Sequence, residues 1–242
     1  MMMINRTLKN ISTLFLIGTF AIFAGCDLAD TSPDAFGEGA IQMMANANNT
    51  NAKSQSSITN QGNIVATDGN NEIEIHEVKF FLDEFELDGA NGTSDFELEE
   101  LNDFIVNLPL DGSPITISQA EIPAGFYDEF EMEIEKPDSD IEVTDRDFRD
   151  ETGSYSVVVK GFFNGNEFTF RSSEDFEINV DLNPPLEISE TSQSTLVVNI
   201  YVATWFTGDD GLIMDPKDAM NTEKINDNIE KSFEAFEDSF ED

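Results

Sequence analysis

Two aspartate-rich stretches carry the side chains whose type and spacing could hold a metal ion. In DSDIEVTDRDFRDE the candidate ligands are Asp138, Asp140, Asp145 and Asp147, and in GDDGLIMD they are Asp209, Asp210 and Asp215. Calcium takes about six to eight oxygen ligands, commonly from loops with aspartates at alternate positions. Neither stretch follows the EF-hand pattern, because the first lacks glycine at its sixth place and the second is too short. In a chain this acidic such loops also arise as solvated surface, and we favour that interpretation over a calcium site for each.

The chain offers little for catalysis. Its only histidine, His76, is the one candidate base for a nucleophilic mechanism, but no Gly-x-Ser-x-Gly elbow accompanies it. We therefore predict that His76 is a structural strand residue. A glycosidase would need two carboxyl groups about 5–9.5 Å apart, and the 50 Asp and Glu make such a pair easy to find. Trp205 is a candidate platform for sugar stacking, with an interior aromatic at one end of the fold as the other interpretation.

The single cysteine, Cys26, follows a stretch with the features of a secretory leader. Residues 1–10 carry two basic side chains and no acid, and residues 11–25 are uncharged and mostly apolar. This apolar stretch is shorter than the about 20 residues that span a bilayer, which favours a cleaved signal peptide over residues 1–25. The end FAGC resembles the bacterial lipoprotein signal box, with Phe23 where leucine is usual. The resemblance implies that Cys26 carries a diacylglyceryl group and becomes the first residue of the mature chain.

The charge of the mature chain limits its partners. From Cys26 onward, 10 Lys and Arg face 50 Asp and Glu, a formal net charge of −40. Nucleic-acid binding depends on Lys and Arg and is excluded as a serious proposal. Electrostatic adhesion to anionic lipid is also disfavoured, so a lipid anchor would act against repulsion. The acids are spread through the whole chain, which favours a hydrated, salt-adapted surface over dedicated cation binding.

Period-two patterns predict an all-β fold. Apolar residues alternate with acids in NEIEIHEVKFFLDEFELDG and FYDEFEMEIEKP, and the phase shifts in the first stretch predict a bulge or a long bent strand. SYSVVVKGFFNGNEFTFRSS predicts a hairpin that turns at Asn164 and Gly165. Short strands separated by turn residues, without intervening helices, predict an antiparallel β-sandwich of the immunoglobulin or transthyretin type.

The two ends of the mature chain are predicted to differ from the sandwich. Residues 26–61 are rich in Asn, Ser, Ala and Thr, and we predict a lipidated N-terminus followed by a flexible linker. The sandwich domain is then expected over residues 62–242. Within it, apolar residues at helical spacing predict one amphipathic α-helix over about 221–240, packed on the sandwich; these residues are Ile225, Ile229, Phe233, Phe236 and Phe240.

Two further segments resemble proteins of one kind. ISQAEIPAGFYDEFEMEIEKP is similar to a signature of uncharacterised β-sandwich lipoproteins from Bacteroidetes, and VATWFTGDDGLIMDP resembles the end of similar lipoproteins. The resemblance implies a β-sandwich at the cell surface or in the periplasm, and it brings no catalytic residues with it.

Together these features predict an exported lipoprotein of the bacterial cell envelope. We expect it to be anchored through Cys26 in the outer membrane, on the periplasmic face or at the cell surface. We expect a non-catalytic role in binding, adhesion or envelope structure, with an envelope protein or polysaccharide as partner. A calcium-dependent carbohydrate-binding module is the alternative, and a glycosidase ranks third. No other cofactor is expected.

Overall fold

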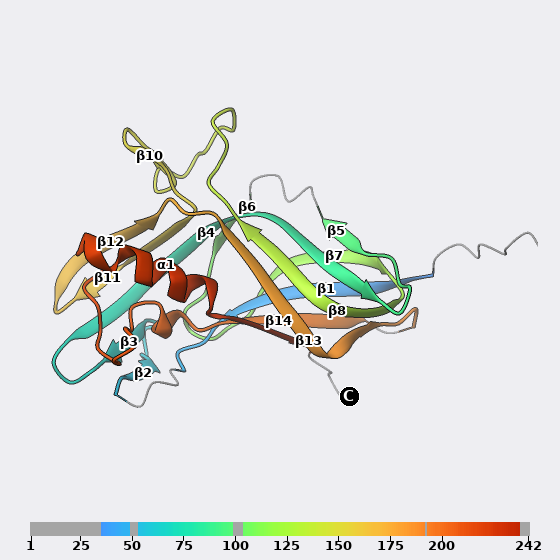
Figure 1. The fold of residues 1–242 in the computed structure, drawn as a ribbon, viewed down its shortest axis with the longest axis horizontal. Coiled ribbons are helices and arrows are strands. Elements are labelled where there is room, and N and C mark those ends of the chain that lie inside the picture. The colour runs from blue at the N-terminus through green and yellow to red at the C-terminus, as the bar shows by residue number, and fades with distance from the viewer. Residues whose placement is uncertain (1–34, 49–52, 99–103, 192, 238–242) are drawn as a thin grey trace, which may run out of the picture. The chain divides into compact units, whose positions relative to one another are not determined.

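Strands dominate the computed structural model, which describes residues 35–48, 53–98, 104–191 and 193–237 (Figure 1). All of these residues belong to one compact unit that begins at Asp34. Its strands are β1 Phe36–Ala45, β2 Gln55–Ile58, β3 Ile64–Thr67, β4 Glu72–Ala90, β5 Phe96–Leu98, β6 Phe104–Asn107, β7 Ile115–Pro123, β8 Gly125–Ile134, β9 Arg149–Asp150, β10 Gly153–Ser154, β11 Val157–Phe163, β12 Asn166–Ser172, β13 Phe176–Ile188, β14 Ser194–Ile200 and β15 Phe233–Glu237. The helical elements are η1 Val202–Thr204, η2 Ala219–Asn221 and α1 Thr222–Glu230.

Two sheets form the core of this unit. The smaller sheet has the order β15-β14-β1-β7, in which β1 runs parallel to β14 and antiparallel to β7. The larger, nine-stranded sheet is built around β4 and includes β8 and β13. One hydrophobic cluster contains side chains from both sheets, for example Met43 and Val198 from the smaller and Phe85 and Phe130 from the larger. The predicted all-β sandwich is confirmed, with one parallel strand pair added.

The long strand β4 organises the larger sheet. Its first part pairs with β3 and β11, its middle with β6, and its last part with β5 and β8. The pairing register shifts opposite β11 near His76, and shifts again opposite β8 where Asp83 has no partner. These extra residues explain the broken alternation in the sequence, so the predicted bulged strand is confirmed.

The predicted linker over residues 26–61 is wrong for the part that the structure describes. Residues 36–45 form β1, which lies between β14 and β7 inside the smaller sheet. The Asn, Ser, Ala and Thr content predicted a flexible linker, but the glycines of this segment serve close packing: a Cβ on Gly37 would lie 2.3 Å from the Ser189 carbonyl oxygen, and one on Gly39 would lie 2.2 Å from Ile122 Cδ1. The sandwich therefore begins before residue 62.

The predicted helix over 221–240 is also too long. It ends at Glu230, and Phe233–Glu237 forms strand β15 on the edge of β14. Ile225 and Ile229 are buried as the helical stripe predicts, but Phe233 is buried as a strand residue and Phe236 is exposed. The reason is that pairing with β14 satisfies the backbone groups of this segment; as a strand it turns Phe233 and Ala235 toward the core and Glu234 and Phe236 outward. Phe240 lies outside the described residues.

Candidate functional site

The outward side of β4, β8 and β13 carries carboxylates in rows. Glu84 pairs in register with Glu133, which pairs in turn with Glu177. The rows continue along the strands, and together they make up the acidic face, defined as Glu84, Glu86, Asp88, Glu129, Glu131, Glu133, Glu177 and Asp181. Because like charges directly opposite each other destabilise a sheet, this face is kept at a cost in folding stability.

Burial and mutual repulsion raise the pKa values of several carboxyl groups on the acidic face. Burial, a hydrogen bond shared with Glu97 and the charge of Glu133 raise the pKa of Glu84 to about 7. Burial and neighbouring carboxylates also raise the pKa values of Glu86 and Glu131. A nearby cation would relieve the same repulsion, so the face favours positively charged ligands.

A groove lies between α1 and the start of β13, and carboxylates line both of its sides. Its volume is about 610 Å³, and we call it the acidic groove, defined by Glu174, Asp175, Phe176, Ala219, Thr222, Glu223, Asn226, Asp227 and Glu230. Glu223, Asp227 and Glu230 follow one another at steps of four and three, which places them along one side of the helix. Glu177 of the acidic face follows Phe176 directly along β13, but the groove includes no residue of that face.

Asn226 distinguishes this groove from a mere collection of surface acids. The residue is only 9% exposed, and its Oδ1 is buried without a hydrogen-bond donor among the described residues. A buried acceptor without a partner costs about 1–3 kcal/mol. The Oδ1 atom is enclosed, so a ligand in the groove can donate a hydrogen bond to this amide only after the side chain has turned over.

Protein cations neutralise only part of the groove. Lys136 Nζ lies 2.6 Å from Asp175 Oδ1, and Lys231 Nζ lies 3.7 Å from Asp227 Oδ2. In the part of the chain that the structure describes, no Lys or Arg forms an ion pair with Glu174, Glu223 or Glu230. Within that same part, no three Asp, Glu, His or Cys residues come close enough together to hold a metal ion.

The first predicted calcium stretch lies between β8 and β11 and is bound to the larger sheet by ion pairs. Lys79 Nζ lies 2.7 Å from Asp145 Oδ2 and 2.5 Å from Asp147 Oδ2, and Lys160 Nζ also lies 2.5 Å from Asp147 Oδ2. Burial alone would lower the pKa of Lys79, but the hydrogen bonds to both aspartates raise it to about 12. Two of the expected calcium ligands therefore bind lysines in this structure.

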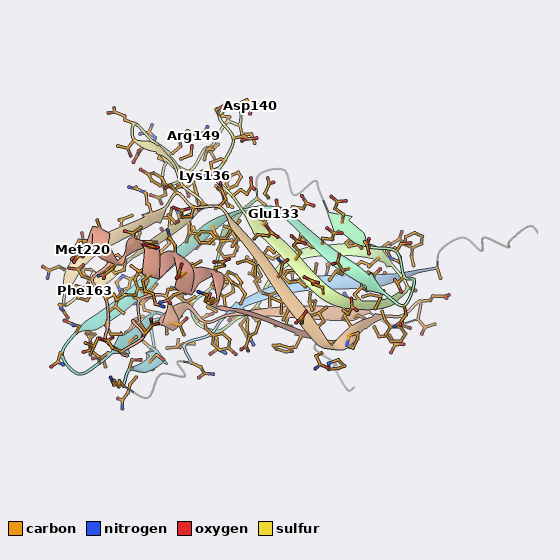
Figure 2. The ribbon with its side chains drawn as sticks, viewed as in Figure 1. Glu133, Lys136, Asp140, Arg149, Phe163 and Met220 are labelled. Atoms are coloured by element: carbon orange, nitrogen blue, oxygen red, sulfur yellow. The ribbon has the colours of Figure 1, made fainter. Side chains whose placement is uncertain are left out.

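Of the remaining candidate aspartates of these stretches, Asp215 is half-buried and the others are exposed. Asp138 and Asp140 are exposed, and the Arg149 guanidinium donates to the Asp138 carbonyl oxygen; Asp140 and Arg149 are labelled in Figure 2. In the second stretch, Asp209 pairs with Lys224 at 2.6 Å, whereas Asp210 and Asp215 accept hydrogen bonds from backbone N–H groups two residues later. Calcium binding at either stretch stays a prediction.

The stacking surface predicted at Trp205 is wrong. Trp205 is fully buried, and its Nε1 donates to Ser232 Oγ at 2.7 Å. An apolar strand precedes it, and the chain turns inward at η1, so the indole completes the core. His76 lies at the bulge of β4, with Nε2 3.0 Å from Glu74 and its ring against Phe162. Cys26 lies outside the described residues, so its lipidation stays a prediction.

Sequence reasoning did not single out the acidic groove. Its signal was present, because Glu223, Asp227 and Glu230 recur at helical spacing beside the apolar stripe. A second signal was the buried polar residue Asn226 next to Ile225 in that stripe. What the sequence lacks is the position of the Glu174–Asp175 segment across the groove.

No protein-family model matches the chain, and comparisons with curated proteins and with solved structures find no similar protein. The resemblance to Bacteroidetes lipoproteins therefore stays a prediction. Among the described residues, no helix is both long enough and apolar enough to cross a membrane.

Proposed function

We propose that this chain is an exported, lipid-anchored protein of the bacterial envelope with a non-catalytic binding role, and that its acidic groove binds an organic cation. The observation that carries the binding role is the buried, unpartnered Oδ1 of Asn226 in a groove lined by carboxylates. The ligand group is a primary ammonium or a guanidinium, because both combine positive charge with several N–H donors.

The size and chemistry of the groove support such a ligand. A volume of about 610 Å³ lies within the about 300–1,000 Å³ that is usual for small-molecule sites. Carboxylates on both walls can accept charge-assisted hydrogen bonds, which are stronger than neutral ones. If the Asn226 side-chain amide rotates by half a turn, its oxygen and its nitrogen change places. The oxygen can then accept a hydrogen bond from the ligand.

The anchoring role rests on the leader and Cys26. A basic start, an uncharged apolar stretch and a cysteine after small residues support export and lipidation. Several acyl chains together hold a protein stably on a membrane, even against charge repulsion. The partner expected in the envelope, a protein or a polysaccharide, would carry ammonium or guanidinium groups.

Isothermal titration of the lipidated protein in neutral detergent with spermine tests the binding role. The buffer contains about 0.15 M salt, which reduces the Debye length to about 8 Å and weakens diffuse attraction. The double variant Glu223→Gln/Glu230→Gln should weaken binding at least about tenfold, since each charge-assisted hydrogen bond is worth about 1.5–3 kcal/mol.

The control variant is Glu121→Gln/Glu187→Gln, which removes the same charge from exposed positions on β7 and β13 away from the groove. It should bind spermine as the parent does. Equal weakening in both variants would mean that spermine affinity depends only on net charge, and it would contradict binding in the acidic groove.

A further inference from the structure

Two exposed phenylalanines lie at the end of the sandwich where β1 begins. Phe36 is 52% exposed and pairs in register with Pro123, and Phe126 is 43% exposed at the start of β8. The tight connection from β7 to β8 joins them, since Ala124 N donates to the Ala35 carbonyl oxygen at 2.6 Å. We call this part of the fold the Phe36 end, made of residues 35–38, 123–126 and 186–191. Large exposed aromatic side chains at one place mark an interaction surface.

The charge around the Phe36 end is one-sided. Glu38, Glu121, Glu187 and Glu190 are exposed there. None of the segments that form this end, nor the turn over 88–97, contains a lysine or an arginine. A partner surface at this end must therefore accept aromatic side chains without offering negative charge.

The length of chain before β1 identifies that partner. Cys26 precedes Phe36 by ten positions, and at about 3.5 Å for each residue that chain reaches at most about 35 Å. A linker extending to residue 61, as the sequence predicted, would have reached about 120 Å. With β1 inside the smaller sheet, a lipid on Cys26 keeps the Phe36 end close to the bilayer surface.

We propose that the Phe36 end contacts the membrane surface, with Phe36 and Phe126 inserted among the lipid headgroups of a neutral bilayer. This contact rests on the lipid anchoring in the proposed function. Aromatic side chains are favoured at the boundary between headgroups and acyl chains. The glutamates beside them are repelled by anionic lipid, so neutral lipid is the preferred surface.

The same contact orients the acidic groove away from the membrane. Strand β13 runs from Phe176, which lines the groove, to Ile188 at the Phe36 end. The paired strand β8 covers the same stretch in nine steps, from Ile134 to Gly125, which correspond to about 30 Å. Met220, beside α1, is 85% exposed and lies at the opposite end of the described unit from the start of β1 (Figures 1 and 2). The groove would thus face partners rather than lipid.

Tryptophan quenching in vesicles tests the contact. The full lipidated chain is reconstituted into phosphatidylcholine vesicles that contain brominated phosphatidylcholine, with Phe36→Trp or Phe126→Trp as reporters. The native Trp205 is fully buried and gives the background. Met220→Trp is the matched control at the far end. We expect quenching of either reporter at least twofold greater than that of the control, and less quenching when phosphatidylglycerol is added.

The outcomes separate the contact from the anchor. Protein that floats with the vesicles but shows no more quenching at positions 36 and 126 than at 220 overturns the contact and leaves the anchor intact. Protein whose Cys26 is unmodified by mass spectrometry and which does not float overturns the anchoring, and the contact with it. Because Phe36 and Phe126 are exposed, the two tryptophan variants should fold like the parent protein. Circular dichroism checks this.

Discussion

Lys79 Nζ lies 2.7 Å from Asp145 Oδ2, which joins the middle of β4 to a loop 66 positions later in the chain. The lysine side chain is 9% exposed, and its charge is neutralised by Asp145 and Asp147 of this loop together with Glu77 on β4. Phe148 in the same loop packs on Phe81 and Val158, which adds an apolar contact on the outward side of the larger sheet. The aspartates that resemble calcium ligands thus have a structural role in holding the loop.

Removing the lysine should destabilise the protein strongly. Removing one partner of a buried ion pair costs about 3–5 kcal/mol when the other charge is left uncompensated. Here Asp145 would lose its ion pair, whereas Asp147 would keep its pair with Lys160, so the lower end of this range applies. We expect Lys79→Met to lower the free energy of unfolding by about 3 kcal/mol in urea titrations. Lys231→Met is the control, since its pair with Asp227 is exposed and should cost less than about 1 kcal/mol. Equal effects of the two changes would contradict the structural role of the loop contact.

Calcium should add no specific stability. The carboxylates of Asp145 and Asp147 bind Lys79, and a calcium ion would have to displace this lysine. A ligand that binds only the native state raises the melting temperature by mass action. We expect equal melting temperatures with calcium and with a chelator in about 1 M salt, where the Debye length is about 3 Å. A clear rise specific to calcium would restore the metal site at one of the two aspartate-rich stretches.

The acidic face should make the protein less stable as the pH rises from about 4.5 to about 7. Glu84 has a pKa of about 7 in the folded protein, against 4.5 as its ordinary value. Between these values the folded state holds more protons than the unfolded state, so stability falls with increasing pH. Glu84→Gln should therefore raise the melting temperature at pH 8 and reduce its pH dependence in this window. A variant with the parent's pH profile would argue against repulsion at this position.

Because β1 lies inside the smaller sheet, any residue larger than glycine at position 37 should destabilise the protein. A Cβ there would approach the Ser189 carbonyl oxygen to 2.3 Å, and backbone on both sides must move to relieve it. Overpacking of this kind costs about 1–3 kcal/mol, so Gly37→Ala should shift the urea midpoint accordingly. Glu38→Ala, at the neighbouring exposed position, should leave the midpoint nearly unchanged. If Gly37→Ala were equally neutral, residues 36–45 would not occupy this strand.

The sequence predicted the sandwich because acids and apolar residues alternate over long parts of β4 and β8, with breaks where the pairing register shifts. It failed at the ends of the domain for two different reasons. FGEGAIQMMA contains glycines that pack against backbone and a side chain, and composition alone cannot tell such glycines from those of a linker. INDNIEKSFEAFE keeps helical spacing through Phe236, and the pairing of Phe233–Glu237 with the edge of β14, which the sequence does not show, makes this part a strand.

The sequence indicated the kind of ligand that the protein favours, but not where in the fold that ligand would bind. A strongly acidic chain indicates affinity for cations, yet it does not show which carboxylates meet. The groove joins Glu174 and Asp175 to side chains about fifty positions later on α1, and this neighbourhood exists only after β13 and the helix have packed. Trp205 shows the opposite problem, since an aromatic residue after an apolar strand suits a ligand platform and a core equally well.

The most direct test of the central claim is a nuclear magnetic resonance titration of the isotope-labelled protein with spermine in about 0.15 M salt. The claim predicts that the side-chain amide of Asn226 and the backbone amides of α1 shift together and saturate at one affinity. Small, non-saturating shifts distributed over the whole acidic face, with Asn226 unaffected, would contradict a specific cation site in the acidic groove.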